Sequence, residues 1–161
     1  DDDQIEGRWA WRFSAAGREI PPGRAWQHVA GLSVLDDVSV RDFQTRTPQW
    51  FAGKNFEAST PVGPWLVTPD EVGDLATRTL VTRVNGEERQ RSSLGDLCFD
   101  VPTLIADISR ILTLQPGDLI ATGTPGGVGF ARKPPEFMKV GDTVEIEITG
   151  IGTLRNKIKE G

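Results

Sequence analysis

The amino-acid sequence predicts a β-rich α+β domain with few short helices, formed as a single unit from residues 1–161. Short runs in which apolar and polar residues alternate recur along the chain, as expected for half-buried strands. Only residues 101–112 repeat their apolar side chains at extended helical spacing. With 161 residues, of which 37% are hydrophobic, the chain can bury one sizeable core, and no internal repeat or low-complexity tract divides it.

Several segments are predicted to be strands. Residues 143–148 alternate cleanly between apolar and polar, and residues 9–13 and 64–68 are further candidates. Asn85 and Gly86 form the strongest short signal for a β-hairpin, because both residue types tolerate the positive φ angles of a tight turn. The segments on either side of this pair are therefore expected to be antiparallel neighbours.

One good helix is predicted in the second half of the chain. Residues 101–112 carry apolar side chains at helical spacing, Asp100 is a suitable N-cap, and Pro102 fits the first turn. Residues 115–117, with their proline and glycine, end the helix. A shorter helix with prolines in its first turn is expected over residues 21–30.

A group of polar residues with complementary chemistry follows an apolar run near residue 35. Asp37 supplies the hard oxygen that Mg²⁺ or Ca²⁺ prefers, and Arg41 offers a planar donor fork for a substrate carboxylate. Gln44 can donate and accept hydrogen bonds, and Lys54 can steady a developing enolate. The alternative interpretation is an exposed turn over residues 36–42 whose ion pairs are screened by solvent.

A second candidate wall of a site is the glycine-rich segment 117–129. An apolar strand leads directly into this loop, where backbone N–H groups can approach a ligand closely and Thr122 and Thr124 add hydroxyls. The loop lacks the Lys-Ser/Thr pair of a phosphate loop, and no helical pattern follows it as a dinucleotide fingerprint requires. A bulged turn between strands is the alternative for this segment.

Composition excludes several classes of partner. The net charge of −5 and the pI near 4.9 argue against nucleic acid, which needs a basic face. No apolar run is long enough to span a bilayer and no signal peptide opens these residues, so we expect no membrane association. The single cysteine, Cys98, fits a reducing compartment and a cytoplasmic location, and its apolar neighbours predict that it is buried.

Several ordered motifs resemble those of one enzyme family. They are residues 28–31, 37–42, 53–56, 61–65, 84–87, 122–129 and 150–156. On these motifs the chain resembles the catalytic domain of the fumarylacetoacetate hydrolase family, in particular its bacterial acylpyruvate hydrolases and the isomerases and decarboxylases of homoprotocatechuate breakdown. The resemblance implies a mixed-sheet roll, a role in aromatic compound catabolism and a homodimer.

The resemblance also implies a metal-dependent chemistry. A divalent cation, Mg²⁺ or another such as Mn²⁺ or Ca²⁺, would bind a 2-oxo or 2,4-dioxo carboxylic acid and stabilise an enolate during hydrolysis, isomerisation or decarboxylation. Metal ligands would be Asp37 and Glu6, and catalytic residues would be Lys54 and Arg41. Substrate-binding residues would be Gln44, Gly123 and Thr124.

Two departures from the family pattern are visible. The family carries a Glu-x-Glu pair in the strand before the motif at 17–20, and an ungapped comparison aligns Glu6 with the first glutamate and Arg8 with the second. A guanidinium cannot ligate a cation. Either the metal site is damaged, the alignment is shifted by a few residues, or the chain binds its ligand without a full carboxylate set.

The second departure concerns parts of the family pattern without a counterpart in these residues. They are an upstream metal-binding aspartate and, in the hydrolases, a lid with a His-Glu pair that activates water. The only histidine, His28, matches a scaffold residue of the family, so we expect a structural role for it. The two departures define an alternative function, a catalytically silent family member that binds a small dicarboxylate or serves in assembly.

Overall fold

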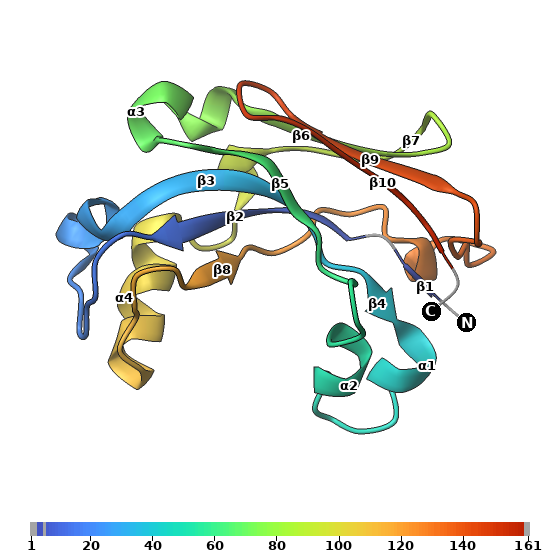
Figure 1. The fold of residues 1–161 in the computed structure, drawn as a ribbon, viewed down its shortest axis with the longest axis horizontal. Helices are drawn as coiled ribbons and strands as arrows, with labels where there is room; N and C mark the ends of the chain where they lie inside the picture. The colour runs from blue at the N-terminus through green and yellow to red at the C-terminus, as the bar shows by residue number, and fades with distance from the viewer. Residues whose placement is uncertain (1–2, 5, 160–161) are drawn as a thin grey trace.

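Two four-stranded antiparallel sheets dominate the computed structural model, which describes residues 3–4 and 6–159 (Figure 1). The first sheet has the order β5-β3-β2-β8, formed by Val62–Val67, Val29–Asp36, Gly7–Phe13 and Leu119–Ala121. The second has the order β10-β9-β6-β7, formed by Gly152–Lys157, Thr143–Ile148, Thr79–Val84 and Glu87–Ser93. Asp3–Gln4 (β1) pairs with Ser39–Val40 (β4).

Helices are short and lie at the ends of the sheets. The α-helices are Arg41–Gln44 (α1), Phe51–Lys54 (α2), Pro69–Val72 (α3) and Val101–Ile111 (α4). The 3₁₀ segments are Pro22–His28 (η1), Leu75–Thr77 (η2), Leu94–Asp96 (η3) and Gly129–Ala131 (η4). Figure 1 shows α1 and α2 side by side below the right-hand half of the molecule, well apart from α4 at the lower left. The predicted β-rich α+β class is confirmed, and every pairing between the described strands is antiparallel.

The predicted hairpin and helix are both confirmed. Asn85 and Gly86 join β6 to β7 with φ angles of 51° and 82°. The Asp100 side chain accepts a hydrogen bond from the backbone N–H of Thr103 at 2.9 Å and caps α4. The expected helix over residues 21–30 forms as the shorter 3₁₀ segment η1.

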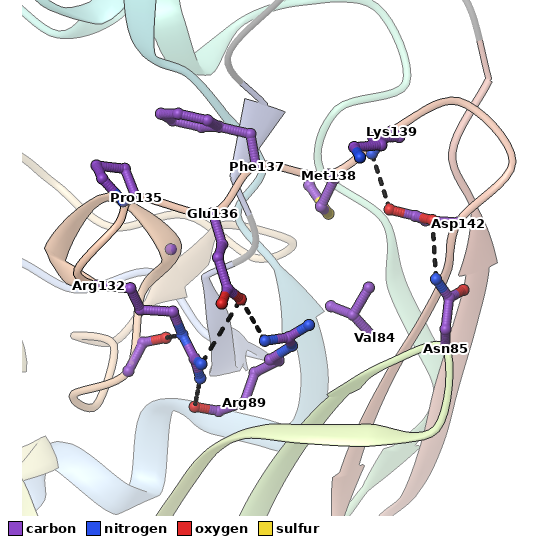
Figure 2. Close-up of a pocket in the computed structure, with 12 residues that line it drawn as sticks. Val84, Asn85, Arg89, Arg132, Pro135, Glu136, Phe137, Met138, Lys139 and Asp142 are labelled. Atoms are coloured by element: carbon purple, nitrogen blue, oxygen red, sulfur yellow. Dashed lines mark hydrogen bonds and ion pairs between the residues drawn. The ribbon is translucent and has the colours of Figure 1, made fainter.

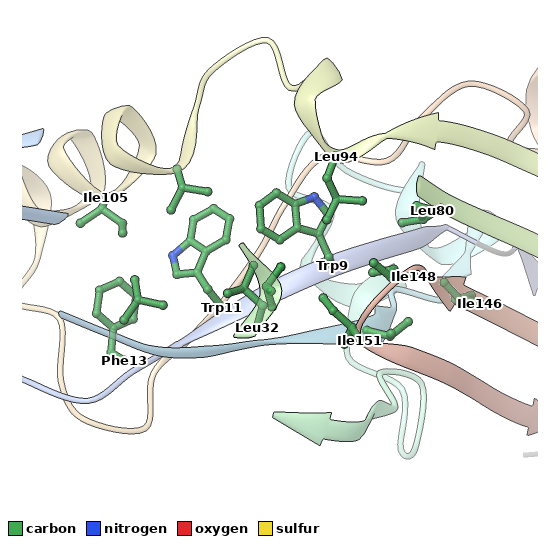
Figure 3. Close-up of a cluster of buried hydrophobic side chains, with 14 of the residues drawn as sticks. Trp9, Trp11, Phe13, Leu32, Leu80, Leu94, Ile105, Ile146, Ile148 and Ile151 are labelled. Carbon is green, nitrogen blue, oxygen red and sulfur yellow. The ribbon is translucent and has the colours of Figure 1, made fainter. Parts of the chain in front are cut away.

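The core lies where the two sheets and α4 meet (Figure 3). Trp9 and Trp11, both on β2, are buried with ring centroids 5.4 Å apart. Trp11 and Phe13 lie toward Ile105 of α4, whereas Trp9 lies toward Leu80 of the second sheet. These aromatic side chains alternate along β2 and therefore share its core-facing side. The strand β2 also leads into the polar site described below.

The expectation that Cys98 is buried is wrong. Its side chain is exposed, and the neighbouring Phe99 is 63% exposed. The reason is local, because the turn η3 before it is held by a capping box between Ser93 and Asp96 and anchors only Leu94 in the core. The chain after this turn runs over the surface until α4 begins. Within the described residues, no helix is long and apolar enough to cross a membrane.

Candidate active site

Five charged side chains from three separate parts of the chain form one cluster. They are Glu6, Arg8, Asp37, Arg41 and Lys54, and we call them the charged cluster. The strand pairing explains how they meet, because Gly7 of β2 lies opposite Asp36 at the end of β3. The residues that flank this pair therefore converge, and α1 and α2 follow β4 closely enough to add their own cations (Figure 1).

Glu6 is the most buried member of the cluster, with 6% of its side chain exposed. Its carboxylate accepts hydrogen bonds from Arg41 at 2.8 Å and Lys54 at 3.0 Å, and also from Ser39 and Arg8. Burial by itself would raise the pKa of Glu6, but the hydrogen bond from Arg8 and the positive charges of Lys54 and Arg8 outweigh it and lower the pKa below 4.5. Glu6 is therefore held as a carboxylate.

Asp37 and Lys54 form the second part of the cluster. The ammonium Nζ of Lys54 donates to Oδ2 of Asp37 at 2.9 Å and contacts the hydroxyl of Ser39. Asp37 is 18% exposed, so solvent and a small ligand can reach it more easily than Glu6. The predicted convergence of these two residues is thus present in the geometry, while their chemical roles stay predictions.

Arg8 lies between the two carboxylates. Its Nη2 donates to Glu6, its Nε lies 3.0 Å from Oδ2 of Asp37, and its Nη1 donates to the backbone carbonyl of Thr122. Arg8 is the second residue of β2 and Glu6 directly precedes that strand, so their side chains meet at its start. The guanidinium therefore occupies the space between Glu6 and Asp37.

Arg41 and Gln44 line the side of the cluster formed by α1. A guanidinium nitrogen of Arg41 donates to Oε1 of Gln44, and the ring of Phe130 lies 5.5 Å from the Arg41 guanidinium carbon. Gln44 is 2% exposed. Phe130 belongs to η4, so the segment after the glycine-rich loop also reaches this side of the cluster.

The glycine-rich loop was predicted to face the substrate with Gly123 and Thr124, but it contacts the charged cluster through another residue. The backbone carbonyl of Thr122 accepts a hydrogen bond from Arg8. The hydroxyl of Thr124 instead donates to the carbonyl of Gly7 at 3.1 Å and accepts from Gln90 at 3.0 Å. Gly123 and Thr124 line a cavity of about 230 Å³ beside Trp9, so their predicted contact with substrate remains untested.

Asp36 and Ser39 are site residues that sequence reasoning missed. Asp36 was included in a possible exposed turn, yet it is 1% exposed, because it is the last residue of β3 and lies opposite Gly7. Burial, together with the negative charges of Asp37 and Glu6, raises its pKa from 3.8 to about 7 although the backbone N–H of Glu6 acts in the other direction. The only signal in the sequence was position, since both residues flank the predicted ligand Asp37.

The charged cluster does not match the ligand preferences of a divalent cation. The resemblance to the fumarylacetoacetate hydrolase family implies such a metal, and Mg²⁺ requires several oxygen ligands around it. Here the guanidinium of Arg8 holds both carboxylates, and no group of three or more acidic, histidine or cysteine side chains suited to a metal occurs among the described residues. The residues present thus do not fit the metal.

A second and larger cavity, of about 580 Å³, lies outside the charged cluster (Figure 2). Arg89 and Arg132 both point toward the carboxylate of Glu136, and Arg132 also donates to the carbonyl of Arg89 at 3.0 Å. On the opposite wall Asn85 donates to Asp142 at 2.8 Å. The two arginines of this cavity thus pair with Glu136 rather than facing an open space, and the charged cluster is the better candidate for catalysis.

The chain is similar in sequence to one protein family and to several curated proteins. Residues 3–159 match the model of the family described as fumarylacetoacetate (FAA) hydrolase, C-terminal. Oxaloacetate tautomerase YisK of Bacillus subtilis is 42% identical over 153 residues, which cover 95% of this chain and 51% of that protein. The human mitochondrial oxaloacetate tautomerase FAHD2B is 46% identical over 144 residues, or 88% of this chain and 46% of that protein. The chain thus spans about half the length of these curated relatives.

Solved structures agree with the described fold over its full length. Fumarylacetoacetate hydrolase from Exiguobacterium antarcticum superposes with a TM-score of 0.96 at 42% identity and covers 100% of this chain and 58% of that chain. The 5-carboxymethyl-2-hydroxymuconate delta-isomerase from Mycobacterium smegmatis gives a TM-score of 0.90 at 38% identity, covering 100% and 61%.

Proposed function

Because the chain belongs to the fumarylacetoacetate hydrolase family, whose members act on oxo acids, we propose that it binds a 2-oxo or 2,4-dioxo carboxylic acid at the charged cluster and promotes its enolisation. The observation that carries this proposal is the convergence of three cationic side chains on one partly exposed spot. Arg8 and Arg41 are each 17% exposed and Lys54 is 18% exposed. Each of these side chains is therefore partly accessible to an incoming anion.

The proposed roles follow from exposure and donor geometry. Arg41 has the planar fork that suits a substrate carboxylate, and Gln44 holds that fork in place through its side-chain oxygen. Lys54 carries an ammonium that can donate to a carbonyl oxygen as negative charge develops there. A group that receives the carbon-bound proton is also needed, and Asp37 is the carboxylate that a substrate can reach.

The proposed reaction is a proton transfer that balances without a further reactant. A proton leaves the carbon next to the carbonyl for Asp37 while the carbonyl oxygen gains a proton from Lys54, so the keto acid becomes its enol. Exchange with solvent then restores both side chains.

The experiment is a tautomerisation assay with oxaloacetate, followed by ultraviolet absorbance of the enol and by deuterium exchange at the carbon next to the carbonyl. Lys54→Gln should lower the rate about 10²–10³-fold, the usual cost of removing an oxyanion donor. The matched control is Lys157→Gln on the exposed face of β10, which should keep the parent rate. A parent chain without activity on oxaloacetate or on related oxo acids would contradict the enzymatic proposal.

A second candidate function is a silent binding module for a small dicarboxylate. The observation in its favour is Arg8, whose guanidinium stands between the carboxylates of Glu6 and Asp37. Oxalate binding measured by calorimetry, combined with no deuterium exchange into any oxo acid tested, would favour this function over the enzyme.

We also propose that the chain forms a homodimer. The observation in its favour is that Trp50 and Phe51, at the start of α2, are 63% and 74% exposed, since aromatic side chains are enriched in interfaces. Light scattering should give twice the mass of 17.6 kDa, and Trp50→Ser should lower that mass. A monodisperse monomer at high concentration would contradict the proposal.

A further inference from the structure

The guanidinium of Arg8 contacts three oxygens that could otherwise serve as ligands of a hard cation. One guanidinium pairs with a carboxylate oxygen of Glu6, a carboxylate oxygen of Asp37 and the carbonyl oxygen of Thr122. We propose that Arg8 is a built-in cation that takes the place of a divalent metal ion, so that this chain binds its oxo-acid ligand without added metal. This inference rests on the proposed function for the nature of the ligand, but its statement about metal stands on Arg8 alone.

The charge balance of the cluster supports this inference. Among the five members of the charged cluster, three cationic and two anionic side chains pair with one another, an excess of one cation within this set. A divalent ion added between Glu6 and Asp37 would lie within a few ångströms of the Arg8 guanidinium and would be repelled by it. It would also have to break the ion pairs that Arg8 makes. An anion faces the opposite situation, because the Arg8, Arg41 and Lys54 side chains attract it.

The side chain at position 8 determines the sign of this charge. With glutamate there the cluster would have three anionic and two cationic members, hence one net negative charge, and three carboxylates would face one another. Carboxylate oxygens are the ligands that Mg²⁺ prefers. The substitution Arg8→Glu should therefore convert an anion site into a site that responds to a divalent cation.

The shape of the ligand follows from the arrangement of the donors. Glu6 is fixed by several donors and is 6% exposed, whereas Asp37 is 18% exposed and shares the Arg8 and Lys54 donors at the surface of the cluster. A small dicarboxylate can replace or join Asp37 as the partner of these two cations. Oxalate is a suitable probe, because its two carboxylates are adjacent and it does not react.

The first arm of the test is thermal unfolding of metal-free protein with and without Mg²⁺, with no substrate present. The melting temperature of the parent should not change with Mg²⁺, and that of Arg8→Glu should rise by about 5 °C or more once Mg²⁺ reaches a hundredfold excess over its dissociation constant. The matched control is Arg12→Glu, which makes the same charge change at the exposed position of β2 and should behave as the parent. A melting temperature of the parent that rises with Mg²⁺ as much as that of Arg8→Glu would overturn the inference.

The second arm needs no variant and remains decisive if Arg8→Glu does not fold. Calorimetric titration of oxalate into the parent should give the same affinity within about twofold in EDTA and in Mg²⁺. An affinity that falls more than tenfold in EDTA would overturn the inference. Absence of oxalate binding under both conditions would contradict the proposed function, while the response of the parent to Mg²⁺ would still decide the role of Arg8.

Discussion

Glu6 holds the charged cluster together, and replacing it with glutamine should destabilise the whole domain. The substitution keeps the size of the side chain but removes the carboxylate that Arg8, Arg41 and Lys54 share, and of these three Arg8 and Lys54 still contact Asp37. Removing one partner of a buried ion pair costs about 3–5 kcal/mol. Because the three cations are each 17–18% exposed, water offsets part of this cost, and we expect about 3 kcal/mol.

The assay is urea and thermal unfolding of parent and Glu6→Gln at pH 7, where the melting temperature should fall by about 6–12 °C. The sign of the pH dependence follows from the lowered pKa of Glu6. Its stabilising contribution is complete above its ordinary value of 4.5 and is lost as the pH falls through the pKa of the folded state. The difference between parent and variant should therefore shrink in acid.

The matched control for this prediction is Glu57→Gln, a change of the same kind at an exposed position after α2. It should alter the free energy of unfolding by less than about 0.5 kcal/mol. A Glu6→Gln variant as stable as this control at pH 7 would refute the view that Glu6 is the buried centre of the cluster.

Three further predictions concern other parts of the molecule. The pKa of Asp36 is raised from 3.8 to about 7, so its contribution to the free energy of unfolding should fall by about 4 kcal/mol as the pH rises from 3.8 to 7. Chemical unfolding across this pH range should show that Asp36→Asn removes this fall. An equal dependence on pH in parent and variant would contradict the prediction. Asp100→Ala removes the N-cap of α4 and should cost about 1 kcal/mol, measured against Asp107→Ala on the exposed face of the same helix. Trp11→Ala opens the core beside Ile105 and should cost about 3–5 kcal/mol or prevent folding, visible as loss of near-ultraviolet circular dichroism.

The parts of the fold that were predicted correctly are those with local signals. Asn85 and Gly86 specify a turn by their own backbone preferences, and Asp100 caps a helix whose spacing is visible within twelve residues. Cys98 was misplaced because an apolar neighbourhood does not reveal which way the chain turns. That direction was set by the capping box of η3, a contact between side chain and backbone.

The candidate site was predictable where several polar residues follow the end of one strand and therefore lie close together. Asp37 and Lys54 meet as expected, and Arg8 contacts Glu6 at the start of β2. The direction of Thr124 was not predictable, since it depends on Gln90 from a distant strand. The same limit applies to Asp36, whose burial follows from pairing with β2.

The most direct test of the account is a crystal structure of the chain grown with oxalate and Mn²⁺, with anomalous scattering measured for manganese. We expect oxalate bound by Arg8, Arg41 and Lys54, with Arg8 still paired with Glu6, and no manganese signal between Glu6 and Asp37. A manganese peak at that position with Arg8 turned away would contradict the central claim, and so would oxalate bound elsewhere on the molecule.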